Sequence, residues 1–239
     1  MPTPVNFNTP DRIIRMALKD AGFLSEGEDP TSEQFADAMN RLNDIINFEQ
    51  TQGLKLWLQY DLAVTLVAGT QSYTIGPAGQ VNMTRPMRVL PEGYYLNTDG
   101  IRRPIFGISR EEWNRLSNPS GQGPITQFFV DKQKTYMKVH FWLVPDSVAA
   151  TGTAHLLIQQ QASNIVSLND SLDFPIEWFM WLRWALAEDL STGQPMAIMN
   201  RCSQFAARYK EGLESWDVED VSTSFAPDYR HSSARSGFR

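Results

Sequence analysis

The sequence predicts an α+β protein: a helical bundle built from N- and C-terminal helices, with an inserted antiparallel β-module and an extended C-terminal tail. Three observations predict this class. Apolar residues recur at helical spacing near both ends, they alternate in the middle third, and the last residues lose both patterns. We expect four segments, namely a helical hairpin at 1–56, the β-module with a short helix at 57–171, C-terminal helices at 172–221 and a partner-docking tail at 222–239.

The first segment is expected to form two paired helices. Thr9 and Pro10 are typical of an N-cap and a first helical residue, and Thr31 with Gln34 has the spacing of a capping box. A glycine ends each apolar pattern, and the link between the helices is short and polar, which favours a hairpin. The apolar positions are Ile13, Ile14, Ala17, Leu18 and Ala21, then Phe35, Ala38, Met39, Leu42, Ile45 and Ile46.

The middle segment changes to the period of a strand. The polar turn from Asp131 to Lys134 separates two alternating runs and predicts a hairpin. Ser109, followed by Glu111 and Glu112, predicts a short capped helix, and the stretch 91–124 around it is expected to be a linking insert. The alternating apolar residues are Leu62, Val64, Leu66, Tyr73, Ile75, Phe128, Val130, Met137, Val139, Phe141, Leu143, Ala154, Leu156 and Ile158.

The helix expected at 176–190 is apolar on nearly every side, so two of its faces must be covered. One interpretation is a central helix inside its own bundle. The other is a helix shared with a neighbouring subunit, with Trp178, Trp181 and Trp184 as subunit-interface candidates, and the two are compatible. Pro195 then opens a last helix that ends near Val218.

The amino-acid composition argues against several classes of protein. Asp and Glu number 27 against 21 Lys and Arg, so the body should repel nucleic acid. The single cysteine and the three scattered histidines predict neither a disulfide nor a zinc site. The N-terminus has no leader pattern and no later run is long enough to cross a membrane, so we expect a soluble protein made in the cytoplasm.

No motif indicates catalysis. Glu111 with Glu112, and Glu188 with Asp189, are adjacent on predicted helices, where neighbours diverge by about 100° and do not face one substrate. The glycine-rich stretch 76–79 lacks the lysine and following helix of a phosphate-binding loop, and Cys202 lies on an apolar helix face. We therefore expect no catalytic residue, cofactor or metal.

The tail carries more aromatic and arginine residues than a solubilising linker needs. A segment of this composition cannot fold alone, but it can become ordered on a partner. The aromatic residues of the tail are Phe225, Tyr229 and Phe238. Its arginines are Arg230, Arg235 and Arg239, and its acidic residue is Asp228.

Several stretches, in order and spacing, resemble the podophage packaged-DNA stabilisation proteins, which are also called tail accessory factors or head-to-tail adaptors. The likeness covers most of residues 9–215, whereas the tail after Trp216 and the 91–124 insert depart from it. It rests on the stretches 11–18, 38–43, 53–57, 66–77, 85–86, 141–145, 172–175 and 193–195.

The resemblance implies a ring of adaptor subunits, twelve in number, that docks beneath the portal protein of a virion. The ring would carry downstream tail proteins, such as a nozzle, needle, spikes or fibres, and DNA would pass through its channel without specific binding. The resemblance also implies that the tail residues Phe225, Tyr229, Arg230, Arg235, Phe238 and Arg239 reach the portal.

Two other functions compete with this one. A virion-associated peptidoglycan hydrolase would need a cleft with convergent acids. A stand-alone DNA-binding protein is disfavoured by the net charge of −6 and by the lack of a basic helix.

Overall fold

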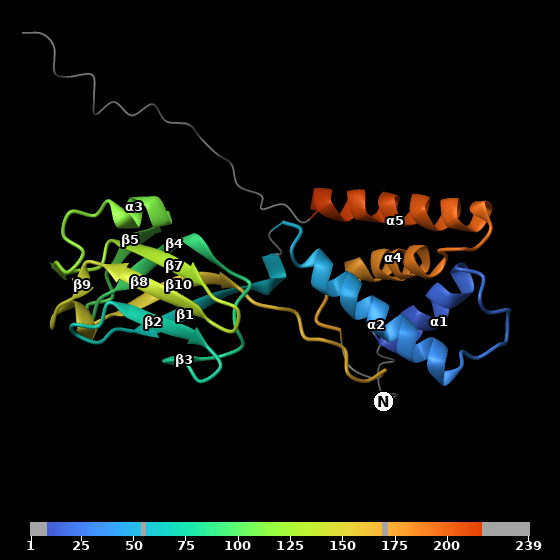
Figure 1. Cartoon of the computed structure of the whole chain (residues 1–239), viewed down its shortest axis with the longest axis horizontal. Helices are drawn as coiled ribbons and strands as arrows, with labels where there is room; N and C mark the ends of the chain where they lie inside the picture. Colours follow the sequence, from blue (N-terminus) through green and yellow to red (C-terminus); the bar gives the residue numbers. More distant parts are fainter. Residues whose placement is uncertain (1–8, 54–55, 169–171, 217–239) are drawn as a thin grey trace, which may run out of the picture.

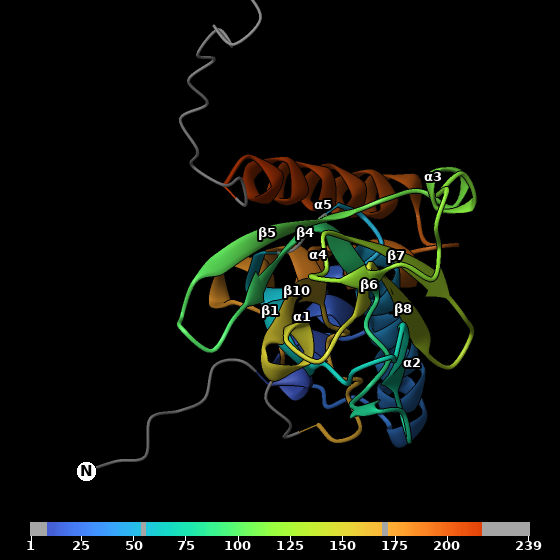
Figure 2. The ribbon, with the colours of Figure 1, turned by 90° about the vertical axis from the view of Figure 1, so that its left-hand side faces the viewer.

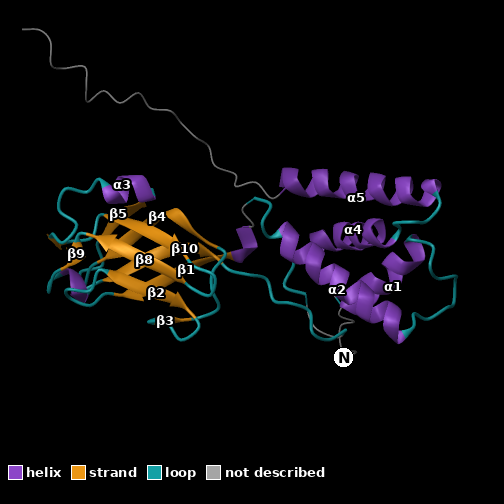
Figure 3. Ribbon diagram, viewed as in Figure 1, coloured by secondary structure: helices purple, strands orange, loops and turns teal. Residues whose placement is uncertain are grey.

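The computed structural model describes residues 9–53, 56–168 and 172–216. Its long helices gather in one part of the molecule and its strands in another (Figures 1 and 3). The chain begins with two helices, runs through the strands and ends with two further helices, so the helical part contains both ends of the described chain.

Most elements are short, and the longest is the last helix, with 21 residues. The helices are α1 (Pro10–Asp20), α2 (Ser32–Glu49), α3 (Arg110–Asn114), α4 (Phe179–Leu190) and α5 (Met196–Trp216), with 3₁₀ turns η1 (Leu56–Leu58), η2 (Ala149–Thr151) and η3 (Ile176–Trp178). The strands are β1 (Gln59–Thr65), β2 (Ser72–Gly76), β3 (Val81–Asn82), β4 (Arg88–Leu96), β5 (Arg102–Gly107), β6 (Gln122–Gly123), β7 (Gln127–Lys132), β8 (Met137–Trp142), β9 (Val144–Pro145) and β10 (Thr153–Gln159).

Eight of the strands form one curled sheet in the order β1-β10-β4-β5-β7-β8-β2-β3. Although β1 and β2 are far apart in this order, only residues 66–71 join them, and the Val67 N–H donates a hydrogen bond of 2.8 Å to the Tyr73 hydroxyl. So short a connection requires the two ends of the sheet to approach each other. The sheet is therefore nearly closed and barrel-like (Figure 2).

The inside of this sheet is filled by a hydrophobic core. Strand alternation supplies it, because every second residue of β1, β8 and β10 points inward. The buried members are Leu62, Val64, Leu66, Tyr73, Ile75, Tyr95, Ile105, Ile125, Phe128, Val139, Phe141, Ala154, Leu156 and Ile158.

The predicted fold class is wrong. The protein is mixed and dominated by its large sheet, and is not a helical bundle with a β-module inserted into it. The sheet is not purely antiparallel either, since β5 pairs with β7 and β2 with β3 in parallel. The connection from β5 to β7 is a crossover that contains α3, and a local alternating pattern does not show which strands will meet in this way.

The sequence pattern missed β4 and β5, which lie in and beside the expected linking insert. Pro91 argues against a strand because it donates no hydrogen bond. In the structure, the register between β4 and β10 shifts between Leu156 and Ile158, so Pro91 lies in an irregular stretch of the ladder. Gly93 is needed beside it, because a Cβ there would come within 2.6 Å of the His155 carbonyl oxygen.

The local helix signals are confirmed. Thr31 and Gln34 form the predicted capping box at the start of α2, and Ser109 with Glu112 forms another at the start of α3. The hairpin of β7 and β8 is also confirmed. The helix expected at 176–190 differs slightly, because its first turn is the 3₁₀ turn η3 and α4 starts at Phe179.

Helix α4 occupies the middle of the helical part, where it packs against α1, α2 and α5. These helices share a second core, separate from the core of the sheet. Leu182 and Leu186 of α4 are fully buried in it. The covering that the apolar α4 requires is thus largely provided within the chain.

Replacing Leu182 with alanine should test this central role. The side chain is fully buried and alanine is a good helix former, so the loss reflects packing alone. We expect the free energy of unfolding in urea to fall by about 3 kcal/mol. Met180→Ala on the same helix is the control, and because Met180 is 40% exposed it should cost about 0.5 kcal/mol. Equal losses in the two variants would contradict the assignment of α4 as the core helix.

Candidate interaction surfaces

The three tryptophans predicted as subunit-interface candidates lie inside their own chain. Trp178, Trp181 and Trp184 are 2, 5 and 8% exposed. Trp184 stacks on Phe205 of α5 at 4.5 Å, and Trp178 lies 5.0 Å from the ring of Trp57. The central-helix interpretation therefore explains the burial of these residues, and the structure does not test their role at a subunit interface.

One surface that α4 does offer is a groove of about 430 Å³ bounded by α2, α4 and α5. We call it the acidic groove, because its lining includes four carboxylates but only two cations. Its apolar floor includes Ile45 and Trp181, and Phe48 at its edge is 63% exposed. The full lining is Arg41, Asp44, Ile45, Phe48, Glu49, Trp181, Ala185, Glu188, Asp189, Ser203, Ala206, Ala207 and Lys210.

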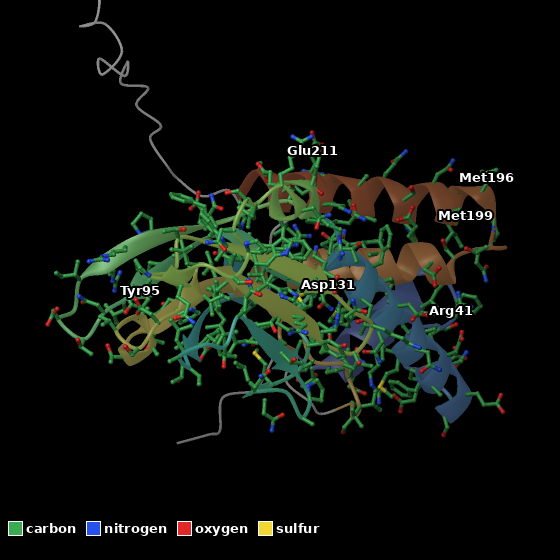
Figure 4. All side chains as sticks on the ribbon, turned by 60° about the vertical axis from the view of Figure 1, so that its left-hand side comes forward. Arg41, Tyr95, Asp131, Met196, Met199 and Glu211 are labelled. Atoms are coloured by element: carbon green, nitrogen blue, oxygen red, sulfur yellow. The ribbon has the colours of Figure 1, made fainter. Side chains whose placement is uncertain are left out.

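Two ion pairs hold the helices together around this groove. Arg41 of α2 reaches Asp189 of α4 at 3.0 Å, and Lys210 of α5 reaches Glu49 of α2 at 3.1 Å. The hydrogen bond to Asp189 is the main reason why the pKa of Arg41 is raised. Glu49 is 1% exposed, so its charge must be paired. In Figure 4, Arg41 is seen on α2, in the helical part of the molecule.

Neither ion pair was predicted from the sequence. Glu49 follows Leu42 and Ile46 at helical spacing on the buried face of α2, so its position alone indicates a buried carboxylate. Its partner Lys210 is 161 residues further along the chain. No local pattern could have identified that partner.

A second groove, of about 410 Å³, lies between α1 and the start of α4. We call it the α1/α4 groove. Its lining holds two guanidinium groups and no carboxylate, and Arg183 also donates to Asp20 at 2.5 and 2.8 Å. The lining residues are Arg12, Ile13, Met16, Ile176, Phe179, Met180 and Arg183.

The two grooves lie on opposite faces of α4. Phe179, Met180 and Arg183 line one groove, whereas Trp181, Ala185 and Glu188 line the other. With about 100° between successive residues, the centres of these two sets differ by roughly 180° around the helix axis. A single helix thus presents two unlike surfaces, one with excess carboxylates and one with guanidinium groups.

The outer face of the sheet carries a polar row across four strands. Tyr94 of β4 stacks on His155 of β10 at 4.5 Å, and both contact Asp61 of β1, at 2.8 Å from the tyrosine hydroxyl and 3.0 Å from the imidazole Nδ1. The hydrogen bond to Asp61 is the main reason why the pKa of Tyr94 is raised. The guanidinium of Arg102 covers the other side of the tyrosine ring at 4.6 Å. These contacts tie β1, β10, β4 and β5 together.

A second cluster fixes the short helix α3 to the sheet. The ring of Trp113 packs near His140 at 5.6 Å, and Phe129 stacks on the same imidazole. Arg110 lies over Phe129 and pairs with Asp131 of β7, a residue seen on the sheet in Figure 4. Burial lowers the pKa of His140, with help from the nearby charge of Lys138.

Three of the four carboxylates considered for catalysis in the sequence have partners within the chain. Glu188 and Asp189 both line the acidic groove, so the expectation that this pair would not face one surface is not met. Glu112 caps its own helix and that hydrogen bond to Ser109 lowers its pKa, whereas Glu111 pairs with Arg115. Asp189 pairs with Arg41. Cys202 is fully buried, and burial raises the pKa of its thiol.

The described part of the chain offers neither a metal site nor a membrane span. Within residues 9–53, 56–168 and 172–216, no group of three or more His, Cys, Asp or Glu side chains could hold a metal ion. No helix among these residues is long and apolar enough to cross a membrane. The candidate portal-binding residues Phe225, Tyr229, Arg230, Arg235, Phe238 and Arg239 lie outside the described residues.

Comparison with known proteins adds no assignment. No model of a known protein family matches the chain, and no curated protein matches it. The resemblance to phage head-to-tail adaptors therefore stays a prediction from the sequence motifs.

The His140 cluster predicts a dependence of stability on pH. Because the pKa is lowered in the folded state, the unfolded chain binds more protons in the window between the lowered value and the usual value of about 6.5. The stabilisation is therefore complete above the usual value and is lost as the pH falls through that window. We expect His140→Phe, which keeps an aromatic ring, to flatten the pH dependence of the free energy of unfolding between about pH 7.5 and 5. Parallel curves for the two proteins would show that His140 does not contribute.

Proposed function

We propose that this protein is a structural head-to-tail adaptor of a tailed bacteriophage. Copies of it form a ring beneath the portal protein, close the filled head over its packaged DNA and carry the tail components below. The observation that carries this proposal is the pair of unlike grooves on opposite faces of α4.

A ring requires such unlike surfaces. In a cyclic assembly of more than two copies, each subunit contacts its neighbours through two different patches. The acidic groove and the α1/α4 groove differ in lining charge and are roughly 180° apart around α4. A carboxylate-rich face on one copy can therefore meet a guanidinium-rich face on the next, and electrostatic complementarity would set the order of the subunits.

The apolar content of the grooves supports the same proposal. Protein interfaces combine apolar anchors at the centre with a polar rim. Met180 and Ile176, exposed at 40 and 61%, are anchors of this kind in the α1/α4 groove. Phe48 has the same role beside the acidic groove.

Net charge supports a role beside moving DNA. Each cation that contacts a phosphate adds salt-dependent affinity, which would slow ejection through a channel. The net charge of −6 avoids such retention. The family resemblance of residues 9–215 adds the position of the ring at the portal vertex, with downstream tail proteins attached below.

The ring contact can be tested by placing a charge in the α1/α4 groove. Met180→Asp adds a carboxylate that would repel the acidic groove of a neighbour, while the partly exposed position should leave folding intact. We expect the yield of ring on purified portal protein, measured by native mass spectrometry, to fall by about tenfold or more.

Met196→Asp is the matched control. Met196 is 68% exposed at the start of α5 and lines neither groove (Figure 4), so this variant should assemble normally. The proposed ring contact is contradicted if Met180→Asp and Met196→Asp assemble equally well.

The tail is the proposed contact with the portal. Phe225, Tyr229 and Phe238 would fill portal grooves, while Arg230, Arg235 and Arg239 would pair with acidic groups there. A chain that ends after Val221 should bind portal rings at least about tenfold more weakly, measured by surface plasmon resonance or interferometry. Unchanged affinity of the shortened chain would remove the tail from the portal contact without touching the ring proposal.

A further inference from the structure

The acidic groove has an unbalanced charge that points to a cationic occupant. Of its four carboxylates, Glu49 and Asp189 are paired with Lys210 and Arg41. Asp44 and Glu188 make no ion pair within residues 9–53, 56–168 and 172–216. An occupant that supplied two cations near these carboxylates would balance the lining.

The groove also has an apolar floor that favours aromatic side chains. Ile45, Ala185 and Ala206 line it, with Trp181 below and the exposed ring of Phe48 at its edge. Aromatic side chains bury a large apolar area at a low cost in conformational entropy, so they suit these apolar lining residues. The chemistry that fits is an extended peptide with both aromatic residues and arginines.

The chain itself contains one such peptide, with five residues between it and the end of α5. Residues 222–239 carry Phe225, Tyr229 and Phe238 together with three arginines and a single carboxylate, Asp228. Fully extended, these residues span up to roughly 60 Å. The part of α5 that lines the groove, Ser203 to Lys210, is only about 10 Å long, and it ends about 9 Å from Trp216. The tail therefore has ample length to return along α5.

We propose that residues 222–239 bind in the acidic groove of their own chain, with Arg230 and Arg235 facing Asp44 and Glu188 and with aromatic rings on the apolar floor. In the sequence, Asp217, Glu219 and Asp220 form an acidic run between α5 and this segment, and repulsion from the groove would disfavour binding of that run there. Docking within one chain is favoured over docking between chains, because a short connection gives an effective concentration in the millimolar range. This inference goes beyond the adaptor role and concerns the free protein, in the absence of a portal.

Distance measurement between two spin labels tests the docking in the full chain. The labels are attached at Asn40→Cys, on the exposed side of α2 near the groove, and at Ser232→Cys in the tail. Cys202 is fully buried and should not react with the reagent. In a sample diluted with unlabelled protein, we expect a narrow distance distribution, because a docked tail holds Ser232 at a fixed place.

Charge reversal then links the distance to the groove. Asp44→Lys with Glu188→Lys should broaden the distribution by releasing the tail, and Arg230→Glu with Arg235→Glu should do the same. Combining all four substitutions restores opposite charges and should restore the narrow distribution. Glu26→Lys with Glu92→Lys, two exposed acids away from the groove, changes the net charge equally and should leave the distribution narrow.

Three results would overturn the proposal. One is a broad distribution in the native background. Another is a narrow distribution that survives reversal of the groove charges, which would place the tail elsewhere on the molecule. The third is a short distance that disappears on dilution with unlabelled protein, which would show that the groove holds the tail of a second copy. None of these results bears on ring formation with the portal, which the Met180→Asp variant tests separately.

Discussion

The helical part of this protein depends on covering α4, a helix with apolar residues on nearly all sides. Such a helix is stable in water only if neighbours surround it. In this chain α1, α2 and α5 surround it, and they come from both ends of the described residues. Covering α4 therefore brings together helices that the strands separate in the sequence.

Covering by three helices leaves two strips of α4 incompletely closed. Cylinders packed around a central cylinder leave grooves where they do not touch one another, and the side chains at those positions decide the character of each groove. On one strip the neighbours contribute Arg12 and Met16, and on the other they contribute Asp44 and Lys210. The helix that organises the core thus also produces the two surfaces that an assembly could use.

The sheet has its own core and its own closure. Its interior side chains do not mix with those of the helices. The short link from β1 to β2, in which the Val67 N–H donates to the Tyr73 hydroxyl, keeps the two ends of the sheet close together. The helical part has its own stabilising contact, the ion pair between Lys210 of α5 and Glu49 of α2. The two parts can therefore be stable for separate reasons, which suits a subunit that contacts different partners at different places.

Local signals in the sequence predicted what depends on neighbouring residues in the chain. The capping boxes at Thr31 and Ser109 were predictable because a cap needs only three residues of spacing. The size and mixed direction of the sheet were not predictable, because they depend on strands that meet across long separations. β4 was not predicted because Pro91 cannot donate a ladder hydrogen bond. In the structure, the register between β4 and β10 shifts at this point, and the sequence of β4 alone does not show that shift.

The grooves also depend on contacts between residues far apart in the chain, which local sequence patterns do not predict. The sequence showed that the helix at 176–190 must be covered, but it could not show that the covering would come from within the chain. The prediction of Trp181 and Trp184 as interface residues follows from this limit, although their positions in the structure are internal. Met180 and Glu188 are exposed at the surface of α4, Met180 in the α1/α4 groove and Glu188 in the acidic groove beside Trp181.

A tail bound in the acidic groove would compete with both uses proposed for an adaptor. The groove could not meet a neighbouring subunit while the tail filled it, and the tail could not meet the portal while it lay in the groove. A free chain would then be kept from forming rings with other free chains. A ratio of ten docked tails to one undocked tail requires a docking free energy of only about 1.4 kcal/mol. Two partly exposed ion pairs and a few aromatic contacts can supply it. Such a weak contact is also easily displaced by a partner that binds the tail better, and each displacement would free one groove for the next subunit.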